Sequence, residues 1–321
     1  MRVLKEIIIW KNDAGQRLDR FLRKYLAKAS KGFIYKMIRK KNIALNGRRA
    51  SPDTIISEGD TIQLYLADAT IEKFRGELKI IESNLTPDIV YEDDNIILLN
   101  KPVGILSHSV DKDDGNNMVD SMIYYLYRRG DYNPVDERTF IPAICNRLDR
   151  NTSGIIIGAK NSQSLRAMNR AMRRGNIGRY YRTIVKGRME RDGIIEGYLI
   201  KDEGTNQVRV SDREMEGSQK IITRIYILGI SSGYSLLGVE LITGRTHQIR
   251  AHLSHIGYPI IGDMKYGDVD TNRYFVDRYG LENQLLHGYR IGFSELERPF
   301  DYLNGREFIG PAGQKFEEIE G

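Results

Sequence analysis

Three polar segments of the chain carry side chains that could bind or act on a charged ligand. The first, NRLDRNTSG, starts at Asn146 and places Asp149 between Arg147 and Arg150, directly before an apolar run that begins at Gly154. So many polar groups are unusual on the approach to a buried strand. The same pattern also fits a structural turn, in which Asp149 accepts hydrogen bonds from backbone N–H groups. Spacing alone does not separate these two interpretations.

The second segment, LITGRTHQIRAHLSHIGYPIIGDMKYG, starts at Leu241. Its Arg245 and Arg250 suit phosphate or carboxylate groups, because a guanidinium is planar and donates two parallel hydrogen bonds. Three histidines in the segment could suggest a metal site: His247, His252 and His255. The metalloprotease pattern HExxH is absent and no cysteine lies nearby. Helix-capping or core roles are therefore the better interpretation, and we expect no metal.

The third segment, RYYRTIVKG, starts at Arg179 and carries Tyr181. A strand tyrosine usually packs in a core or at a sheet edge, whereas in a basic cleft it can stack on an unstacked nucleobase. The sequence contains no GxxxxGK[ST] phosphate loop, no GxGxxG dinucleotide pattern and no GxSxG serine-hydrolase pattern. The remaining interpretations are an enzyme that acts on RNA and an RNA-binding protein without chemistry.

The positive charge is concentrated in two parts of the chain. Residues 1–70 contain 15 Lys and Arg against 7 Asp and Glu, a surplus of 8 that more than accounts for the net charge of +6. Residues 150–189 contain 10 Lys and Arg and no acid. Clustered cations attract a polyanion such as RNA, although two solvated helix faces would give the same pattern.

The composition indicates a folded chain of two domains. The 321 residues exceed the roughly 150 of one domain, and a hydrophobic fraction of 40% is enough for a core. No apolar run approaches the about 18 residues of a membrane span, and the apolar stretch near the N-terminus is too short for a secretory signal. The single cysteine, Cys145, excludes an internal disulfide. We expect a cytoplasmic protein that does not contact a membrane.

Residues 14–70 are expected to form a compact unit of two basic helices and a small hairpin sheet. Apolar residues recur at helical spacing in GQRLDRFLRKYLAK, and Ser30 can cap a second helix that ends in Arg39, Lys40 and Lys41. IALNG ends in an Asn-Gly turn, and EGDTIQLYL alternates as in a half-buried strand. The unit resembles the alpha-L RNA-binding module. A basic helical pair that contacts another protein is the alternative.

The rest of the chain is expected to be an α+β domain. Residues 71–87 are polar and predict a linker, after which short apolar runs indicate many strands. Few strand–helix–strand alternations of uniform length occur, which favours a mixed, mainly antiparallel sheet over a doubly wound one. This domain is expected to cover residues 88–310, and the last sixteen residues are expected to be a polar tail.

Four motifs together resemble the RluA family of pseudouridine synthases. KPVGILSH (101–108) is similar to the first motif of the family, and NRLDRNTSG to its catalytic motif HRLDxxTSG. TGRTHQIRAHL, continued by GYPIIGDMKYG, matches the third motif, and LLHGYRIGF (285–293) the closing one. Two departures are Asn146, where the family usually has His, and Gly288, where Ala is common. With the alpha-L module in front, the chain looks most like the RluC branch, which modifies large-subunit ribosomal RNA.

The resemblance implies an isomerisation of uridine that needs no cofactor. It assigns Asp149 as the catalytic carboxylate, either as nucleophile towards carbon 1′ or as base towards a glycal intermediate. It also assigns Arg250 as the counter-charge of Asp149, and Tyr181 as the residue that stacks on the target base. The residues expected to bind RNA are basic and come from both domains: Arg147, Arg150, Arg20, Arg39, Lys40, Lys41, Arg48 and Arg245.

We therefore expect a monomeric pseudouridine synthase whose partner is large-subunit ribosomal RNA. Transfer RNA is an alternative substrate. A non-catalytic RNA-binding protein of ribosome assembly is a second alternative, and a metal-dependent nuclease that uses Asp149 and Asp263 is a third.

Overall fold

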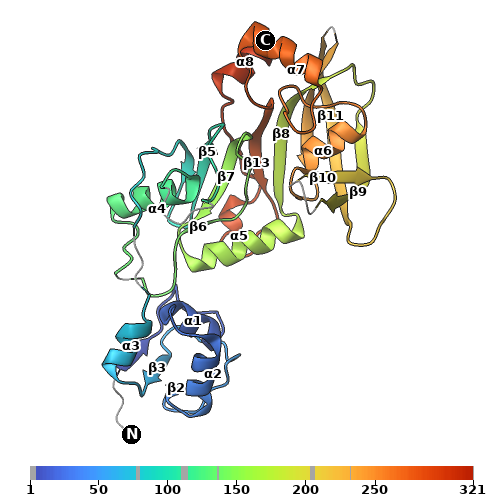
Figure 1. Ribbon diagram of the computed structural model, residues 1–321. Helices are drawn as coiled ribbons and strands as arrows, with labels where there is room; N and C mark the ends of the chain where they lie inside the picture. The colour runs from blue at the N-terminus through green and yellow to red at the C-terminus, as the bar shows by residue number, and fades with distance from the viewer. Residues whose placement is uncertain are drawn as a thin grey trace.

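The structure is a computed structural model that describes residues 5–76, 80–109, 115–135, 137–202, 207–231 and 233–320. In these residues the chain forms a small N-terminal domain and a larger domain built around one long sheet (Figure 1). The small domain contains, in chain order, β1 (Lys5–Ile8), α1 (Leu18–Tyr25), α2 (Lys31–Arg39), β2 (Ile43–Leu45), β3 (Thr61–Leu64) and α3 (Asp68–Phe74). The large domain contains, in chain order, β4 (Ile89–Glu92), β5 (Ile96–Lys101), α4 (Met118–Arg129), β6 (Ala143–Ile144), β7 (Ser153–Ala159), α5 (Ser162–Arg174), β8 (Ile177–Lys186), β9 (Gly193–Lys201), β10 (Val208–Ser211), β11 (Gln219–Ser231), β12 (Tyr234–Leu241), α6 (Gln248–His255), α7 (Val269–Tyr279), β13 (Leu286–Phe293), the 3-10 helix η1 (Asp301–Leu303), β14 (Glu307–Ile309) and α8 (Gln314–Glu320). None of the described helices has the length and apolar character that a membrane span needs.

The N-terminal domain packs α1 and α2 against an antiparallel sheet of order β1-β3-β2. Its core combines the apolar residues at helical spacing in α1 with the alternating residues of β3: Leu18, Phe21, Leu22, Ile62 and Leu64. The Ser30 hydroxyl caps α2, as the sequence predicts, by accepting a hydrogen bond from the Phe33 N–H. The turn after β2 has positive φ at both Asn46 and Gly47, the geometry that an Asn-Gly hairpin turn favours.

This domain extends beyond residues 14–70, the bounds expected from its sequence. β1 pairs with β3, so that Ile7 enters the same core. On the other side of the domain, α3 turns back onto α2, where the Phe74 ring lies 4.7 Å from the Phe33 ring. Both elements are short and carry few apolar residues, so neither produces a strong periodic signal.

The linker expected over residues 71–87 is shorter in the structure. Its first residues belong to α3, in which Ile71 is buried. Ile80 and Leu85 pack against the core of the large domain, and residues 77–79 lie outside the described residues. The connection between the domains is thus confined to a few residues after α3.

The large domain is an α+β fold around a mixed, mainly antiparallel sheet, which confirms the expected fold class. The strand order is β10-β9-β11-β12-β8-β13-β7-β5-β4, with β14 added beside β13 and β6 beside β7. Neighbouring strands are antiparallel except β7 and β13, which are parallel. Apolar residues of α4 and α6 join one core cluster with the sheet, whereas those of α5 join another. The sheet is therefore covered by helices on both sides near its centre (Figure 1).

The expected polar tail is wrong, because the end of the chain is folded onto the large domain. β14 pairs with β13, and α8 inserts Phe316 into a cluster that also contains Phe275 of α7. Phe316 is the buried residue of α8, and one aromatic side chain among many charges gives little sequence signal.

The two domains meet through polar and aromatic contacts rather than through the short connection alone. The Asp13 carboxylate, which is buried, accepts a hydrogen bond of 2.7 Å from the Thr139 hydroxyl. Beside it, the Arg138 guanidinium lies 4.3 Å above the Trp10 ring. Burial raises the pKa of Asp13, and the Thr139 hydrogen bond and Arg138 oppose that rise. These contacts bring α1 of the small domain next to α5 of the large one.

Candidate active site

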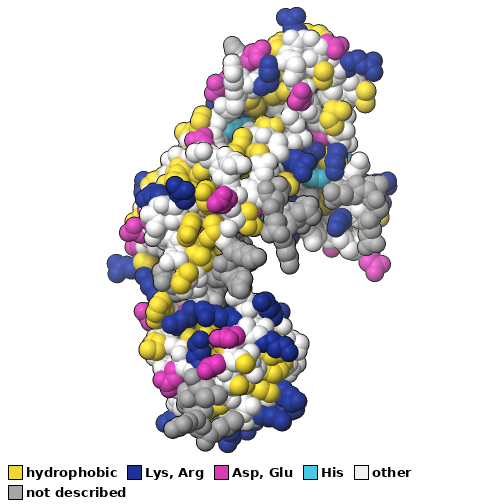
Figure 2. Space-filling view, turned by 60° about the vertical axis from the view of Figure 1, so that its left-hand side comes forward, with side chains coloured by type: hydrophobic (Ala, Val, Ile, Leu, Met, Phe, Trp, Pro, Cys, Tyr) yellow, Lys and Arg dark blue, Asp and Glu magenta, His cyan; other side chains and the backbone are white. Residues whose placement is uncertain are grey.

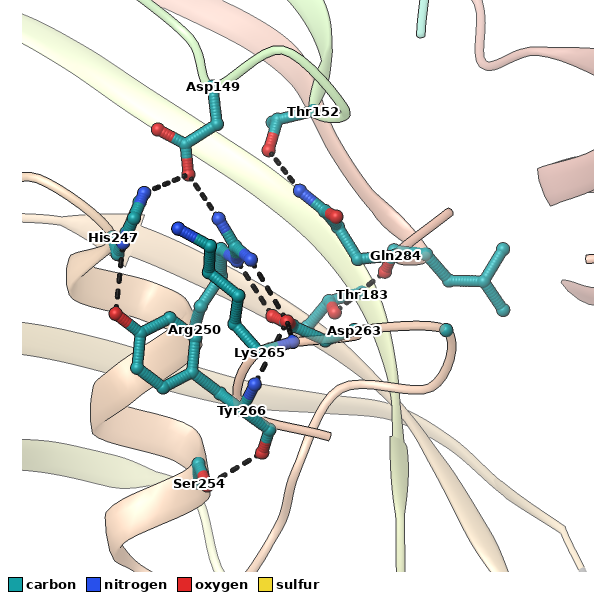
Figure 3. A network of polar contacts seen from close by, with 12 residues as sticks. Asp149, Thr152, Thr183, His247, Arg250, Ser254, Asp263, Lys265, Tyr266 and Gln284 are labelled. Carbon is teal, nitrogen blue, oxygen red and sulfur yellow. Dashed lines mark hydrogen bonds and ion pairs between the residues drawn. The ribbon is translucent and has the colours of Figure 1, made fainter. Parts of the chain in front are cut away.

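Asp149 lies at the end of a chain of three alternating charges. Its Oδ2 accepts a 2.9 Å hydrogen bond from Arg250 Nη1, and Arg250 donates its Nε and Nη2 to the two oxygens of Asp263 at 2.7 and 2.9 Å (Figure 3). The Asp263 side chain is fully buried and that of Arg250 is 8% exposed, whereas that of Asp149 is 22% exposed. Asp149 and Arg250 are 101 residues apart in the chain, and α6 and the loop before β7 bring them together.

The buried Asp263 carboxylate, at one end of this series of three charged side chains, keeps Arg250 in place and charged. Burial alone would raise the pKa of Asp263, but Arg250 and the backbone N–H groups of Lys265 and Tyr266 outweigh it and hold that pKa below its usual value. Burial acts to lower the pKa of Arg250, yet Asp263 and Asp149 together raise it above its usual value. Arg250 is therefore a permanent cation beside Asp149. Because Asp263 uses both oxygens in these bonds, it has no free oxygen for a metal ion, which argues against the nuclease alternative.

Asp149 faces two hollows in the surface. One, of about 270 Å³, is lined by Asp149, Tyr181, Arg245 and Arg250 among others. The other, of about 620 Å³, is more open, and Arg147 and Arg150 are in its wall together with Asp149. Asp149 Oδ1 makes no hydrogen bond to any residue that the structure describes, so one oxygen of the carboxylate is available to a ligand.

Tyr181 forms part of the wall of the smaller hollow. It lies on β8, where only 7% of its surface is exposed, and burial raises its pKa, with Arg179 opposing that shift. A Cβ atom at Gly288 would lie 3.2 Å from Tyr181 Cε1, closer than most such contacts. The glycine found here in place of the common alanine therefore leaves the tyrosine ring more room.

The loop that carries Asp149 is held by the KPVGILSH segment. Lys101 is completely buried at the end of β5, and its Nζ donates to the carbonyls of Pro102, Ile105 and Arg150 at 2.7–2.8 Å. Burial lowers the pKa of Lys101 to about 7, with Asp149 opposing that shift. The three carbonyl acceptors also favour the three-proton form of the amine.

Two further contacts complete this support. The Gly104 N–H donates to the Arg150 carbonyl at 3.0 Å. The Ser107 hydroxyl donates to the Leu148 carbonyl at 2.8 Å and accepts from the Leu148 N–H at 3.0 Å. The backbone on both sides of Asp149 is thus fixed by a segment more than forty residues upstream.

Replacing Lys101 with Met is expected to destabilise the protein and misplace Asp149. Methionine has similar length but leaves the Pro102 and Ile105 carbonyls without this donor and the Arg150 carbonyl with the Gly104 N–H alone, so we expect a loss of about 2–4 kcal/mol in the free energy of unfolding. Chemical denaturation measures this loss, and Lys315→Met on the exposed face of α8 is the matched control. Unchanged stability in Lys101→Met would show that the three contacts contribute nothing.

Glycine residues allow the two central parallel strands to approach closely near Asp149. A Cβ atom at Gly154 of β7 would lie 2.3 Å from the Gly288 carbonyl oxygen of β13, so only glycine fits. Beside this point, His287 is buried between the Ser153 hydroxyl and the Gly310 carbonyl. Asn146, found where histidine is usual, bonds the β7 backbone instead of Asp149. Both departures therefore lie beside the site without altering its charged chain.

The structure divides the basic residues expected to bind RNA into two groups. Arg147, Arg150 and Arg245 are exposed at the two hollows beside Asp149. The others are exposed on the N-terminal domain, away from Asp149: Arg20, Arg39, Lys40, Lys41 and Arg48. Figure 2 shows Lys and Arg side chains distributed over this domain. Both groups face solvent and can reach a ligand.

The histidines of the second polar segment separate in the structure. His252 is buried and bonds Thr223, and His255 bonds Asp212 at the surface. In the described residues no group of three potential ligands could hold a metal ion. His247 alone points towards Asp149, at 3.8 Å, a position that its place in the sequence does not reveal.

Comparison with known proteins identifies the domain that carries this site. Residues 95–255 match the family model of RNA pseudouridylate synthase, and residues 16–62 match that of the S4 domain. The chain belongs to the RNA pseudouridylate synthase family. The pseudouridine synthase and RNA-binding module expected from the motifs are thereby confirmed.

Curated relatives of this synthase resemble it over nearly its whole length. It is 31% identical to ribosomal large subunit pseudouridine synthase C of Vibrio vulnificus, with 95% of this chain and 92% of the relative covered. It is also 31% identical to ribosomal large subunit pseudouridine synthase D of Buchnera aphidicola, with 94% and 89% covered. The solved structure of human RNA pseudouridylate synthase domain containing 4 shares the fold, with a TM-score of 0.56 at 19% identity over 72% of this chain and 90% of that one.

Proposed function

We propose that this synthase converts specific uridines of large-subunit ribosomal RNA into pseudouridine, with Asp149 as the catalytic carboxylate and without a cofactor. The observation that carries the proposal is a partly exposed carboxylate with one free oxygen, paired with a buried arginine in a cavity whose wall also includes Tyr181. The names of the relatives in Vibrio and Buchnera support ribosomal RNA as the substrate. We further propose that the enzyme acts as a monomer in the cytoplasm.

The reaction is an isomerisation whose atoms balance within the uridine. The bond between N1 and carbon 1′ breaks, a bond between carbon 5 and carbon 1′ forms, carbon 5 loses a proton and N1 gains one. An ionised Asp149 can attack carbon 1′ or act as a base towards a glycal. Arg250 favours the ionised carboxylate in either case. Tyr181, in the wall of the same cavity, is proposed to stack on the target base.

Modification mapping tests this proposal. RNA from cells with and without the gene is treated with a carbodiimide that marks pseudouridine and read by primer extension. We expect stops in large-subunit ribosomal RNA that disappear with the gene and return with the wild-type copy. Stops lost from transfer RNA would reassign the substrate, and no lost stop in any RNA would contradict the proposed function.

The target uridine has to unstack from the RNA to reach the cavity. The junction of the two domains carries three basic residues that could hold the RNA, Arg20, Lys24 and Arg166, which we call the basic seam. Arg20 and Lys24 of α1 face Arg166 of α5 across this junction, where the Arg166 guanidinium lies against Gly15. Partial desolvation lowers the pKa of Lys24 and Arg20 lowers it further, Asp13 opposes these shifts, and Arg166 again lowers it. Cations from two domains repel one another here, and bound phosphate groups would relieve that repulsion.

Reversing two charges of the seam is expected to weaken RNA binding. Each lost phosphate contact reduces the slope of log affinity against log salt by about 1, so Lys24→Glu with Arg166→Glu should reduce it by about 2 and weaken binding about 10-fold or more at moderate salt. Filter binding over a salt series measures this. Arg273→Glu with Arg278→Glu on α7, at the other end of the molecule (Figure 1), is the matched control. If the slope of log affinity against log salt is the same in both double variants, the seam does not contribute to RNA binding.

A further inference from the structure

His247 occupies an unusual backbone position between Asp149 and Tyr266. It precedes α6 with φ of 53°, in the left-handed region, which residues other than glycine adopt only rarely. Its side chain is 11% exposed, and Nε2 lies 3.8 Å from Asp149 Oδ2 while Nδ1 lies 2.9 Å from the Tyr266 hydroxyl (Figure 3). Strained conformations of this kind persist where surrounding structure holds them and concentrate at functional sites.

The hydrogen bonds of Tyr266 determine which ring nitrogen of His247 carries the proton. The Val208 N–H of β10 donates to the Tyr266 hydroxyl oxygen at 3.0 Å. Burial raises the pKa of Tyr266, so the phenol keeps its own proton and can donate it to His247 Nδ1. With Nδ1 as acceptor, the neutral imidazole carries its proton on Nε2, the nitrogen that faces Asp149.

The surroundings keep His247 neutral. Burial lowers the pKa of His247, Asp149 opposes that shift, and Arg250 and then Lys265 lower it again, while Asp263 raises it slightly. These four charged groups come from the Asp149 loop, from α6 and from the turn after α6, and β10 contributes only the backbone N–H of Val208. A neutral Nε2–H donor beside Asp149 is thus the state at neutral pH.

We propose that His247 is a positioning residue that donates its Nε2–H to Asp149 Oδ2 when RNA fills the cavity, so that Arg250 and His247 together hold Oδ2 and present Oδ1 to the ribose. The present 3.8 Å is longer than a hydrogen bond, and such contacts tighten in substrate complexes. The inference rests on the proposed function of Asp149. Protonation of His247 would add a second cation at the carboxylate and reduce its reactivity, so activity should fall on the acid side.

Three substitutions test this inference. His247→Phe keeps a ring without a donor, and we expect kcat to fall about 10- to 100-fold, the effect of one hydrogen bond to a charged group, with unchanged affinity for RNA. His247→Gln keeps an N–H donor that does not titrate, so it should restore most of kcat and move the acid limb of the kcat–pH profile to lower pH. Tyr266→Phe removes the hydroxyl that fixes the tautomer and should also lower kcat, but by less than His247→Phe.

The measurement is steady-state release of tritium from carbon 5 of uridine in a transcript of large-subunit ribosomal RNA, with RNA affinity and thermal stability measured in parallel. Wild-type kcat in His247→Phe would overturn the inference, as would an unshifted acid limb in His247→Gln. Wild-type kcat in Tyr266→Phe would contradict the tautomer. If the wild-type enzyme releases no tritium from any transcript, the proposed function itself fails. This outcome differs from those that overturn only the role of His247.

Discussion

Asp149→Asn is expected to reduce turnover by about 10⁴-fold or more, the scale on which loss of a nucleophile or of a base-orienting carboxylate acts in other enzymes. Asparagine has the same shape and can accept the hydrogen bond of Arg250, but it has no negative charge and its amide is a poor nucleophile and base. The substitution therefore removes the reactive group while leaving its surroundings in place.

Two measurements separate this effect from a loss of structure or of binding. Tritium release gives turnover, and filter binding with the same RNA gives affinity, which should stay close to that of the wild type. Asp94→Asn, the same substitution at an exposed residue of the turn between β4 and β5, is the matched control. Turnover retained in Asp149→Asn would refute the role of Asp149 outright, whereas a parallel loss of affinity would indicate disturbed binding.

Arg250→Met is expected to reduce both turnover and stability. It leaves Asp263 buried without a counter-charge, and breaking a buried ion pair from one side costs about 3–5 kcal/mol. Asp149 loses its cation as well, so turnover should fall sharply even where the protein remains folded. Denaturant titration and tritium release measure the two losses separately.

A double-mutant cycle identifies the source of the instability. Asp263→Asn removes the buried charge but keeps the oxygen that accepts from the backbone N–H groups of Lys265 and Tyr266. Combined with Arg250→Met, it should be clearly less destabilising than the sum of the two single changes. Strict additivity would show that Arg250 and Asp263 do not stabilise one another.

The pH dependence of these effects has a defined sign. In the wild type the pKa of Asp263 is lowered on folding, so its contribution to stability is complete above the pKa of the unfolded chain and is lost as pH falls through the folded pKa. In Arg250→Met the unpaired, buried Asp263 takes up a proton more readily. The stability difference between Arg250→Met and wild type should therefore shrink between neutral and mildly acid pH.

Local signals predicted much of the fold. α5 is flanked by Asn161, whose side chain accepts from the Ser164 N–H, and by Gly175 in the left-handed conformation, and both capping residues can be read in the sequence. The apolar run after Gly154 likewise predicted a buried strand, because its residues are buried on both faces in β7. Such elements are specified by their own residues.

The elements that sequence reasoning missed depend on distant partners. β1 is a strand because β3 lies beside it, and α8 is ordered because Phe316 meets α7. The apolar run around β1 is short and has no periodicity of its own, and α8 has few apolar residues among many charges, so neither pattern alone predicts its element.

The same distinction applies to the site. Asp149, Tyr181 and Arg250 were proposed from motifs, and folding brings them to one cavity. Lys101 and His247 lie in two of the same motifs but received no role, since a lysine at the end of a strand is usually solvated and a histidine among polar residues has many roles. The structure draws attention to Lys101 because its side chain is completely buried. It draws attention to His247 because the two ring nitrogens face Tyr266 and Asp149.

The support of the Asp149 loop by its backbone has a consequence for how such an enzyme can change over time. Lys101, Gly104 and Ser107 bond carbonyl and N–H groups of the loop, which every residue type except proline provides. The exposed side chains of Arg147 and Arg150, on either side of Asp149, take no part in these contacts. Under the proposed function, substitutions at these two positions are expected to change which RNA is chosen while Asp149 keeps its position, so that new targets become accessible without a change in the chemistry.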